Sequence, residues 1–210
     1  MMFRSSYAVS VLLLVTFLIS PAAAQESVDQ DFSQAMQILD QDSSHTEQAI
    51  PLLKKSAERG NAEAAYNLGV AFYKDNKTLE ALKWFKQASE AGNVRAKFNL
   101  ATIYEEKKPL PVPPAYLTAL YSTAAEGGIV QAMHRLGILK ITGQYEDKDA
   151  VNGLAWLFLA EKYEDDDVKD DLGQSLRMVT QDQKNMAKDA ADKLRAKLEQ
   201  NPEFLNNMSL

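Results

Sequence analysis

Residues that could carry out nucleophilic or metal chemistry are scarce in this sequence. The chain has no cysteine, so it has no thiolate nucleophile, no thiolate metal ligand and no disulfide. Its two histidines, His45 and His134, are far apart in sequence, and neither belongs to a His-Glu-x-x-His zinc motif. No Gly-x-Ser-x-Gly elbow, phosphate loop or dinucleotide fingerprint is present. The sequence therefore predicts a protein that is not an enzyme and binds no cofactor.

An acidic run is the strongest candidate for a cation site. Residues 164–167 are all acidic, and Asp170 and Asp171 follow them. The run lacks the Asp-x-Asp-x-Asp-Gly spacing and the distal glutamate of a calcium loop. Carboxylates at the N-terminus of a helix are stabilised by the helix dipole. We therefore interpret the run as the solvated start of a helix and predict no metal site.

A repeat with helical spacing organises the chain. Its core is the pattern Ala-x-x-x-Leu, which occurs at Ala64/Leu68, Ala96/Leu100 and Ala132/Leu136, with a degenerate first copy at Ala35/Leu39. The leucines of the three clear copies are 32 and 36 residues apart. A fixed period in the thirties, built from helix-forming residues, is typical of a solenoid of stacked helical hairpins.

Each copy continues into a second helix. Glycine closes three of these helices, at Gly60, Gly92 and Gly128. Glu164 stands at the fourth position, where the repeat pattern stops. Trp84 and Trp156 occupy the same place in two of the second helices, so the register holds in both halves of the hairpin.

Two proline features interrupt the repeats. Pro51 would damage a helix interior, so we expect it in the first turn of a helix that runs from about Thr46 to Arg59. Residues 109–114 hold four prolines and account for the longer period of 36. Such a run favours an extended, polyproline-like path. We interpret it as a stiff connector, and docking of the run into an aromatic groove is the alternative.

The C-terminal region is predicted to cap the array. Asp149 is expected to cap the last repeat helix, and Thr180 with Gln183 forms a capping box that opens a helix to about Gln200. The apolar stripe of this helix is narrow and consists of Ala187, Ala190, Leu194 and Leu198. A solenoid needs end caps with one polar face. We expect residues 201–210 to be a loose tail.

The aligned copies read Ala-x-x-x-Leu-Gly-x-x-aromatic, a turn, and then Ala-x-x-Trp-aromatic-x-x-Ala-x-x-x-Gly. This pattern resembles the Sel-one-like repeat (SLR) family, a relative of the tetratricopeptide repeats, over roughly residues 31–164. The departures are Ala101 for glycine, Lys140 for the aromatic residue and Glu164 for the last glycine. The resemblance implies an all-α fold, namely a right-handed α-solenoid of about four antiparallel helix pairs. It implies a repeat domain over residues 25–164, with capping helices and a tail over 165–210, that acts as an interaction scaffold without chemistry of its own.

The resemblance also indicates where a partner would bind. In tetratricopeptide-like arrays, the first helices of the hairpins line a concave groove. The partner-binding residues predicted on that basis are Tyr66, Asn67, Val70, Tyr73, Phe98, Asn99, Thr102, His134, Arg135 and Ile138. Glu105 and Ile141 occupy equivalent positions.

Two features of this groove suggest how it would bind. An aromatic–Asn pair occurs in two copies, and asparagine can hydrogen-bond a peptide backbone beside the apolar contact that an aromatic ring supplies. Arg135 is expected to bind a carboxylate. The alternative interpretation is that these residues are ordinary half-buried packing positions.

Residues 1–24 have the pattern of a cleaved secretory signal peptide. Arg4 precedes an apolar stretch over residues 8–19, and residues 21–24 offer a small-residue cleavage site. The stretch is shorter than the roughly 20 residues that span a bilayer, so an uncleaved anchor is the weaker alternative. Removal of Arg4 changes the net charge from −6 to −7. A chain this acidic should repel nucleic acid and anionic lipid.

Together these features predict a non-catalytic adaptor in the bacterial cell envelope, periplasmic or else secreted. It would bind a segment of a partner protein on its concave face. The alternatives are a factor associated with peptidoglycan or envelope enzymes, and a secreted effector that engages host proteins. All three share one fold and differ in the partner.

Overall fold

The computed structural model describes residues 21–41, 46–107, 110–163 and 168–208. Most of the expected signal peptide, His45 and the acidic run 164–167 lie outside these residues. Within them the chain forms α-helices and no strands. The helices are α1 (Pro21–Gln41), α2 (Thr46–Glu58), α3 (Ala62–Lys74), α4 (Thr78–Glu90), α5 (Val94–Glu106), α6 (Pro114–Glu126), α7 (Val130–Thr142), α8 (Ala150–Lys162), α9 (Val168–Arg177), α10 (Gln181–Leu198) and α11 (Pro202–Met208).

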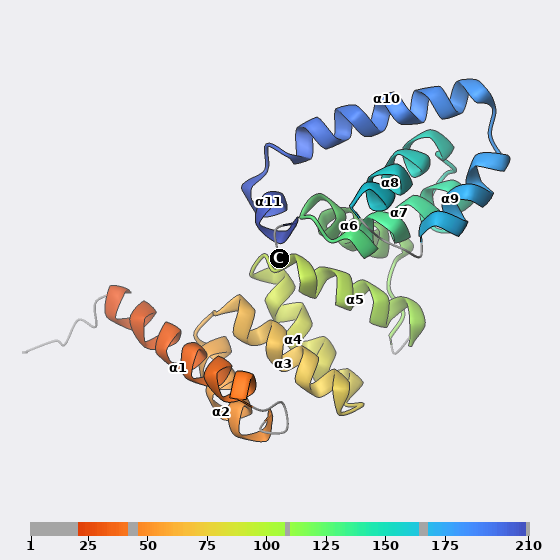
Figure 1. Cartoon of the computed structure of the whole chain (residues 1–210). Helices are drawn as coiled ribbons and strands as arrows, with labels where there is room; N and C mark the ends of the chain where they lie inside the picture. Colours follow the sequence, from red (N-terminus) through yellow and green to blue (C-terminus); the bar gives the residue numbers. More distant parts are fainter. Residues whose placement is uncertain (1–20, 42–45, 108–109, 164–167, 209–210) are drawn as a thin grey trace, which may run out of the picture.

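The first eight helices form four hairpins stacked into a solenoid. Each helix from α2 to α7 packs against the helix before it and the helix after it in the chain, and Figure 1 shows the pairs following one another along the array. Helices α2 to α8 are each 13 residues long, so each spans about 20 Å. The predicted all-α solenoid is confirmed.

The repeated Ala-x-x-x-Leu pattern forms the core between the hairpins. Its members are fully buried in all three clear copies: Ala64, Leu68, Ala96, Leu100, Ala132 and Leu136. Alanine lets neighbouring helix axes approach closely, and leucine fills the layer between them. Gly69 shows how close that approach is, because a Cβ at this position would lie 2.5 Å from the ring of Phe85.

Short turns join the second helix of one hairpin to the first helix of the next. Asn61 and Asn93 cap α3 and α5, and their side-chain oxygens accept hydrogen bonds from the amides of Ala64 and Ala96 at 3.0 and 2.9 Å. These caps define the helix starts that follow the glycine turns. Asp149 caps α8 in the same way, as predicted.

One expectation at the N-terminal end is wrong. Pro51 lies inside α2, beyond its first turn. It is exposed, so water can hydrogen-bond the Glu47 carbonyl that the missing N–H leaves unpaired. Helix α1, which holds the degenerate first copy, begins at Pro21, a residue suited to the first helical position and followed by three strong helix formers.

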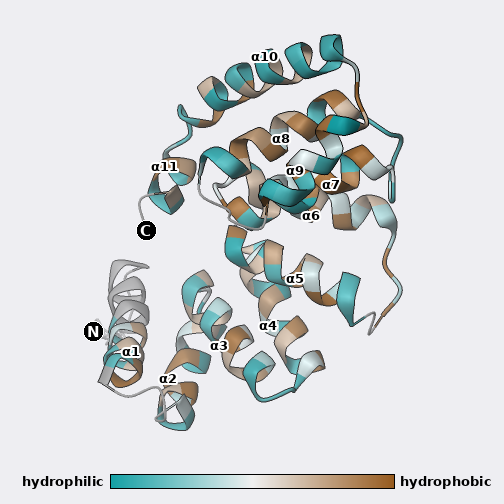
Figure 2. Ribbon diagram, turned by 45° about the vertical axis from the view of Figure 1, so that its right-hand side comes forward, coloured by the Kyte–Doolittle hydropathy of each residue, from teal (hydrophilic) through white to brown (hydrophobic). Residues whose placement is uncertain are grey.

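Helices α9 to α11 close the C-terminal end of the solenoid. Helix α10 packs along α8 and is largely hydrophilic elsewhere (Figure 2). The predicted capping box of Thr180 and Gln183 is present. The stripe differs slightly from the prediction, because Ala191 is buried whereas Ala190 and Leu194 are half-buried.

The predicted loose tail is instead a helix that packs on the array. Phe204 of α11 is 1% exposed, and its ring lies 5.7 Å from that of Tyr163. The Asn207 side-chain amide donates to the carbonyl oxygen of Gly127 at 2.8 Å. The tail prediction failed because these partners come from distant parts of the sequence, which no local pattern in residues 201–210 reveals.

Candidate functional site

The first helices of two successive hairpins form the walls of a hollow on the solenoid. Helices α5 and α7 supply most of its lining, α9 closes one side and α6 contributes Tyr121. Its volume is about 480 Å³. The lining residues are Phe98, Thr102, Glu105, Glu106, Tyr121, Gln131, His134, Arg135, Ile138 and Asp171. We call this space the α5–α7 hollow.

Half of the predicted partner-binding residues line the α5–α7 hollow. They are Phe98, Thr102, His134, Arg135 and Ile138. The other five do not line it, namely Tyr66, Asn67, Val70 and Tyr73 on α3 and Asn99 on α5. All ten side chains are half-buried. The predicted residues that line the hollow thus all belong to the third and fourth hairpins.

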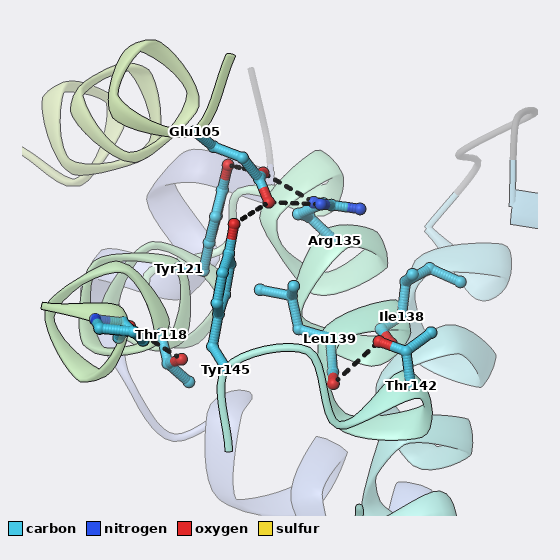
Figure 3. Close-up of polar contacts among 9 residues, drawn as sticks. Glu105, Thr118, Tyr121, Arg135, Ile138, Leu139, Thr142 and Tyr145 are labelled. Carbon is cyan, nitrogen blue, oxygen red and sulfur yellow. Dashed lines mark hydrogen bonds and ion pairs between the residues drawn. The ribbon is translucent and has the colours of Figure 1, made fainter. Parts of the chain in front are cut away.

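A polar network built around Glu105 links three parts of the chain at the edge of the hollow (Figure 3). The Glu105 carboxylate accepts hydrogen bonds from Arg135 Nε at 2.8 Å, from the Tyr121 hydroxyl at 2.8 Å and from the Tyr145 hydroxyl at 3.1 Å. A second bond from the Arg135 guanidinium makes the ion pair bidentate. Glu105 is 13% exposed, so the network is mostly shielded from water.

The network shifts the pKa of its ionisable side chains. Burial by itself would raise the pKa of Glu105, but the hydrogen bonds from Arg135 and Tyr121 outweigh it and hold the pKa below its usual value. Burial raises the pKa of Tyr121 and of Tyr145, and the neighbouring carboxylate adds to both shifts. The site therefore holds a fixed carboxylate with two neutral phenols.

Arg135, which was expected to bind a carboxylate, contacts a carboxylate of its own chain. Its guanidinium is paired with Glu105, which lies at an equivalent groove position one hairpin earlier. The repeat register placed both residues on the groove, so their pairing could have been inferred from it. The repeat register could not have identified Tyr145 as a partner of Glu105, because Tyr145 lies in the irregular turn after α7.

A second polar contact joins α7 to the capping region. His134 Nε2 lies 2.9 Å from a carboxylate oxygen of Asp171 on α9. Asp171, which the sequence analysis assigned to a solvated helix start, therefore lines the hollow beside His134. No group of acidic residues and histidines suited to a metal ion occurs among the described residues.

The N-terminal members of the predicted groove are engaged in intrachain contacts. The Tyr66 ring lies 5.9 Å from the ring of Phe85, and the Arg95 guanidinium carbon is 4.7 Å from the Tyr66 centroid. Asn67 donates its side-chain amide to the Glu63 carbonyl of its own helix at 2.9 Å. The two aromatic–Asn pairs are therefore not equivalent, since Phe98 lines the hollow and Tyr66 does not.

The proline connector borders a separate hollow of about 450 Å³. Leu110, Pro111 and Val112 form part of its lining, opposite Tyr104 and Tyr145. Its remaining lining residues are Glu105, Pro114 and Leu117. The described part of the connector thus forms part of the wall of this hollow.

Comparison with known proteins identifies the architecture. No family model and no curated protein matches the sequence. A crystal structure of a protective antigen present in uropathogenic Escherichia coli strains, which displays an SLR fold, aligns with a TM-score of 0.74 and 23% identity. A Sel1 repeat protein from Oxalobacter formigenes aligns over 75% of this chain and 67% of its own, with a TM-score of 0.65 and 22% identity. This chain has the SLR fold.

The match to the Escherichia coli antigen covers 90% of this chain but only 42% of the antigen. This chain therefore spans less than half the length of that structure.

Proposed function

We propose that this SLR protein is a non-catalytic scaffold of the bacterial cell envelope that binds a segment of a partner protein in the α5–α7 hollow. One observation carries the proposal: groove positions from two successive hairpins line a single hollow with apolar and polar groups together. Phe98 and Ile138 offer apolar contact, and Thr102 and Gln131 offer hydrogen bonds. A concavity that offers apolar contact beside hydrogen-bonding groups is suited to binding a peptide segment.

The hydrogen bonds around Glu105 support a structural role for the charged residues of the network. Glu105 is paired with Arg135, and Tyr121 and Tyr145 donate to the same carboxylate. Such a closed set of hydrogen bonds positions the helices that carry these residues.

The cell envelope is proposed on the N-terminal sequence. Residues 1–24 fit a cleaved signal, and the described helices include none that is long and apolar enough to cross a membrane. Cell fractionation followed by N-terminal sequencing of the mature protein tests this part. Recovery from the periplasm or the medium with Gln25 first is expected, whereas a cytoplasmic protein that retains Met1 would contradict it.

A matched pair of substitutions tests the binding face. Phe98 and Tyr66 are half-buried aromatic residues at the same repeat position, but only Phe98 lines the hollow. Phe98→Ala should abolish the capture of a partner from fractionated envelopes, while Tyr66→Ala should retain it. Melting curves of both variants exclude unfolding as the cause. Equal capture by the two variants would reject the hollow as the binding face.

A photo-crosslinking residue provides an independent test in cells. Placed at Thr102, inside the hollow, it should form an adduct with one partner protein. The same residue at Glu80, an exposed position of α4 outside the hollow, should not form that adduct. Adducts with peptidoglycan, or with host proteins after secretion, would contradict the adaptor function and support one of the alternative functions.

A further inference from the structure

The α5–α7 hollow carries more negative than positive charge. Three carboxylates line it, on Glu105, Glu106 and Asp171, whereas Arg135 is the only lysine or arginine in its described lining. Arg135 is already paired with Glu105. The remaining carboxylates lie on different helices of the lining, Glu106 on α5 and Asp171 on α9.

These two carboxylates remain accessible to a ligand. Glu106 is exposed, and no side chain among the described residues forms an ion pair with it. The Asp171 side chain is 43% exposed even though it contacts His134. The field in the hollow therefore favours a cation, and the negative net charge of the whole chain acts in the same direction.

An apolar surface lines the same hollow as the two carboxylates. Phe98 on α5 and Ile138 on α7 are half-buried, and both line the hollow. The Phe98 ring packs edge-on against Tyr121 at 6.1 Å, which fixes its orientation. An aromatic ring held in this way offers a rigid contact for an apolar side chain at little entropic cost.

We propose that the hollow binds a cationic segment of the partner protein. In this arrangement one apolar side chain of the segment contacts Phe98 and Ile138, and flanking lysine or arginine side chains lie against Glu106 and Asp171. This inference rests on the proposed function and adds the chemistry of the partner. Charge complementarity selects the occupant, because an acidic segment would meet repulsion from both carboxylates.

Selection from random dodecapeptides displayed on phage tests the proposal without a known partner. Purified mature protein is the bait, and binders that also attach to the Thr102→Trp variant, which fills the hollow, are removed. The enriched peptides should carry an excess of Lys and Arg over Asp and Glu, next to a Leu, Ile or Phe. Enrichment of neutral or acidic peptides, or no enrichment at all, would overturn the proposal.

Charge reversal then measures the contribution of one carboxylate to the affinity for a selected, fluorescein-labelled peptide. Glu106→Lys should weaken binding at least about tenfold at low salt, and added salt should reduce the difference. Glu80→Lys makes the same charge change on α4, outside the hollow, and should alter binding less than about twofold. Equal effects of the two reversals would show that only the net charge matters and would overturn a specific role for the hollow.

The cellular crosslink separates failure of this inference from failure of the proposed function. A Thr102 adduct whose crosslinked peptide is basic by mass spectrometry supports both. An adduct with an acidic or neutral peptide overturns the cationic occupant and leaves the scaffold function intact. Absence of any adduct specific to Thr102 overturns both.

Discussion

Glu105 connects more elements than any other polar residue of the site. It lies at the end of α5 and receives hydrogen bonds from α6, from α7 and from the turn after α7. Because these partners belong to two successive hairpins, the carboxylate sets the position of one hairpin relative to the next. The lowered pKa of Glu105 means that this link depends on the ionised carboxylate.

Replacement of Glu105 by glutamine should change how stability depends on pH. The pKa of Glu105 is lower in the folded chain than its usual value of 4.5, so its stabilisation is complete above about pH 4.5 and is lost as the pH falls through the folded pKa. Glu105→Gln should therefore cost about 2 kcal/mol at pH 7 and clearly less near pH 3. Urea unfolding at a series of pH values measures both.

The exposed Glu161 on α8 provides the control for this prediction. Glu161→Gln should give an unfolding free energy that follows the wild-type pH dependence. A Glu105→Gln profile parallel to the wild type would show that the network does not stabilise the fold.

Leu100 tests the core register of the repeat. It is fully buried in the third hairpin, so Leu100→Ala should lower the free energy of unfolding by about 2–5 kcal/mol. Leu79 at the start of α4 is 64% exposed, and Leu79→Ala should cost less than about 0.5 kcal/mol. Thermal and urea unfolding compare the two. Similar losses would contradict the register.

Helix α11 acts as a strap between the C-terminal cap and the third hairpin. Besides its contact with Tyr163, it packs on the turn between α6 and α7, where Gly127 takes the place that Arg59 and Ala91 have in the earlier turns. A Cβ on Gly128 would lie 2.9 Å from the Phe204 carbonyl oxygen, and one on Gly127 would lie 2.6 Å from the Val94 side chain. The close approach of Val94 explains the additional glycine at Gly127, whereas Gly128 shares the positive φ of Gly60 and Gly92 and is also covered by α11.

A pair of glycine substitutions isolates the contribution of the strap. Gly60 and Gly128 have nearly the same φ, +100° and +93°, but a Cβ on Gly60 meets nothing within 4 Å. Gly60→Ala should cost only the backbone strain of about 1–2 kcal/mol. Gly128→Ala should cost about 1–3 kcal/mol more, because it must also displace α11. Urea unfolding measures the two changes.

Removal of the strap provides the control. In a chain that ends at Gln200, the two glycine substitutions should have equal cost, because the atoms that oppose a Cβ on Gly128 belong to Phe204 and Asn207. A difference that persists without α11 would assign the extra cost to the turn itself.

The whole molecule has unequal ends. At the C-terminal end, α8 is packed between α7 and α10, whereas at the N-terminal end α1 packs mainly on α2 (Figure 1). In a solenoid each repeat is stabilised only by its neighbours. The structure therefore predicts a gradient of stability along the array.

Hydrogen exchange measured by mass spectrometry should reveal this gradient. Amides of residues 30–41 in α1 should exchange at least about tenfold faster than those of α8, because opening α1 breaks contacts with little more than one helix. Peptides from α4 and α5 provide internal references. Equal protection of α1 and α8 would indicate that the array opens as one cooperative unit.

Several features followed from the sequence because they depend on local spacing. The period of the alanines and leucines determined the hairpins, and the capping residues Asp149 and Thr180 marked where helices begin. The groove register identified Phe98 and Arg135 among the residues that line the hollow. The caps and the Ala-x-x-x-Leu spacing act within about one or two helical turns, and the repeat carries the same local pattern from one hairpin to the next.

Tertiary structure alone decided which part of the predicted groove forms a hollow. It brought α9 against α7 through His134 and Asp171, and it enclosed Glu105 with a tyrosine from an irregular turn. It also placed α11 on the α6–α7 turn, through a hydrogen bond between residues 80 positions apart. These contacts depend on how the helices pack against one another: α10 runs back along α8 and brings α11 to the α6–α7 turn. They join residues far apart in the sequence, so no local pattern within one repeat encodes them.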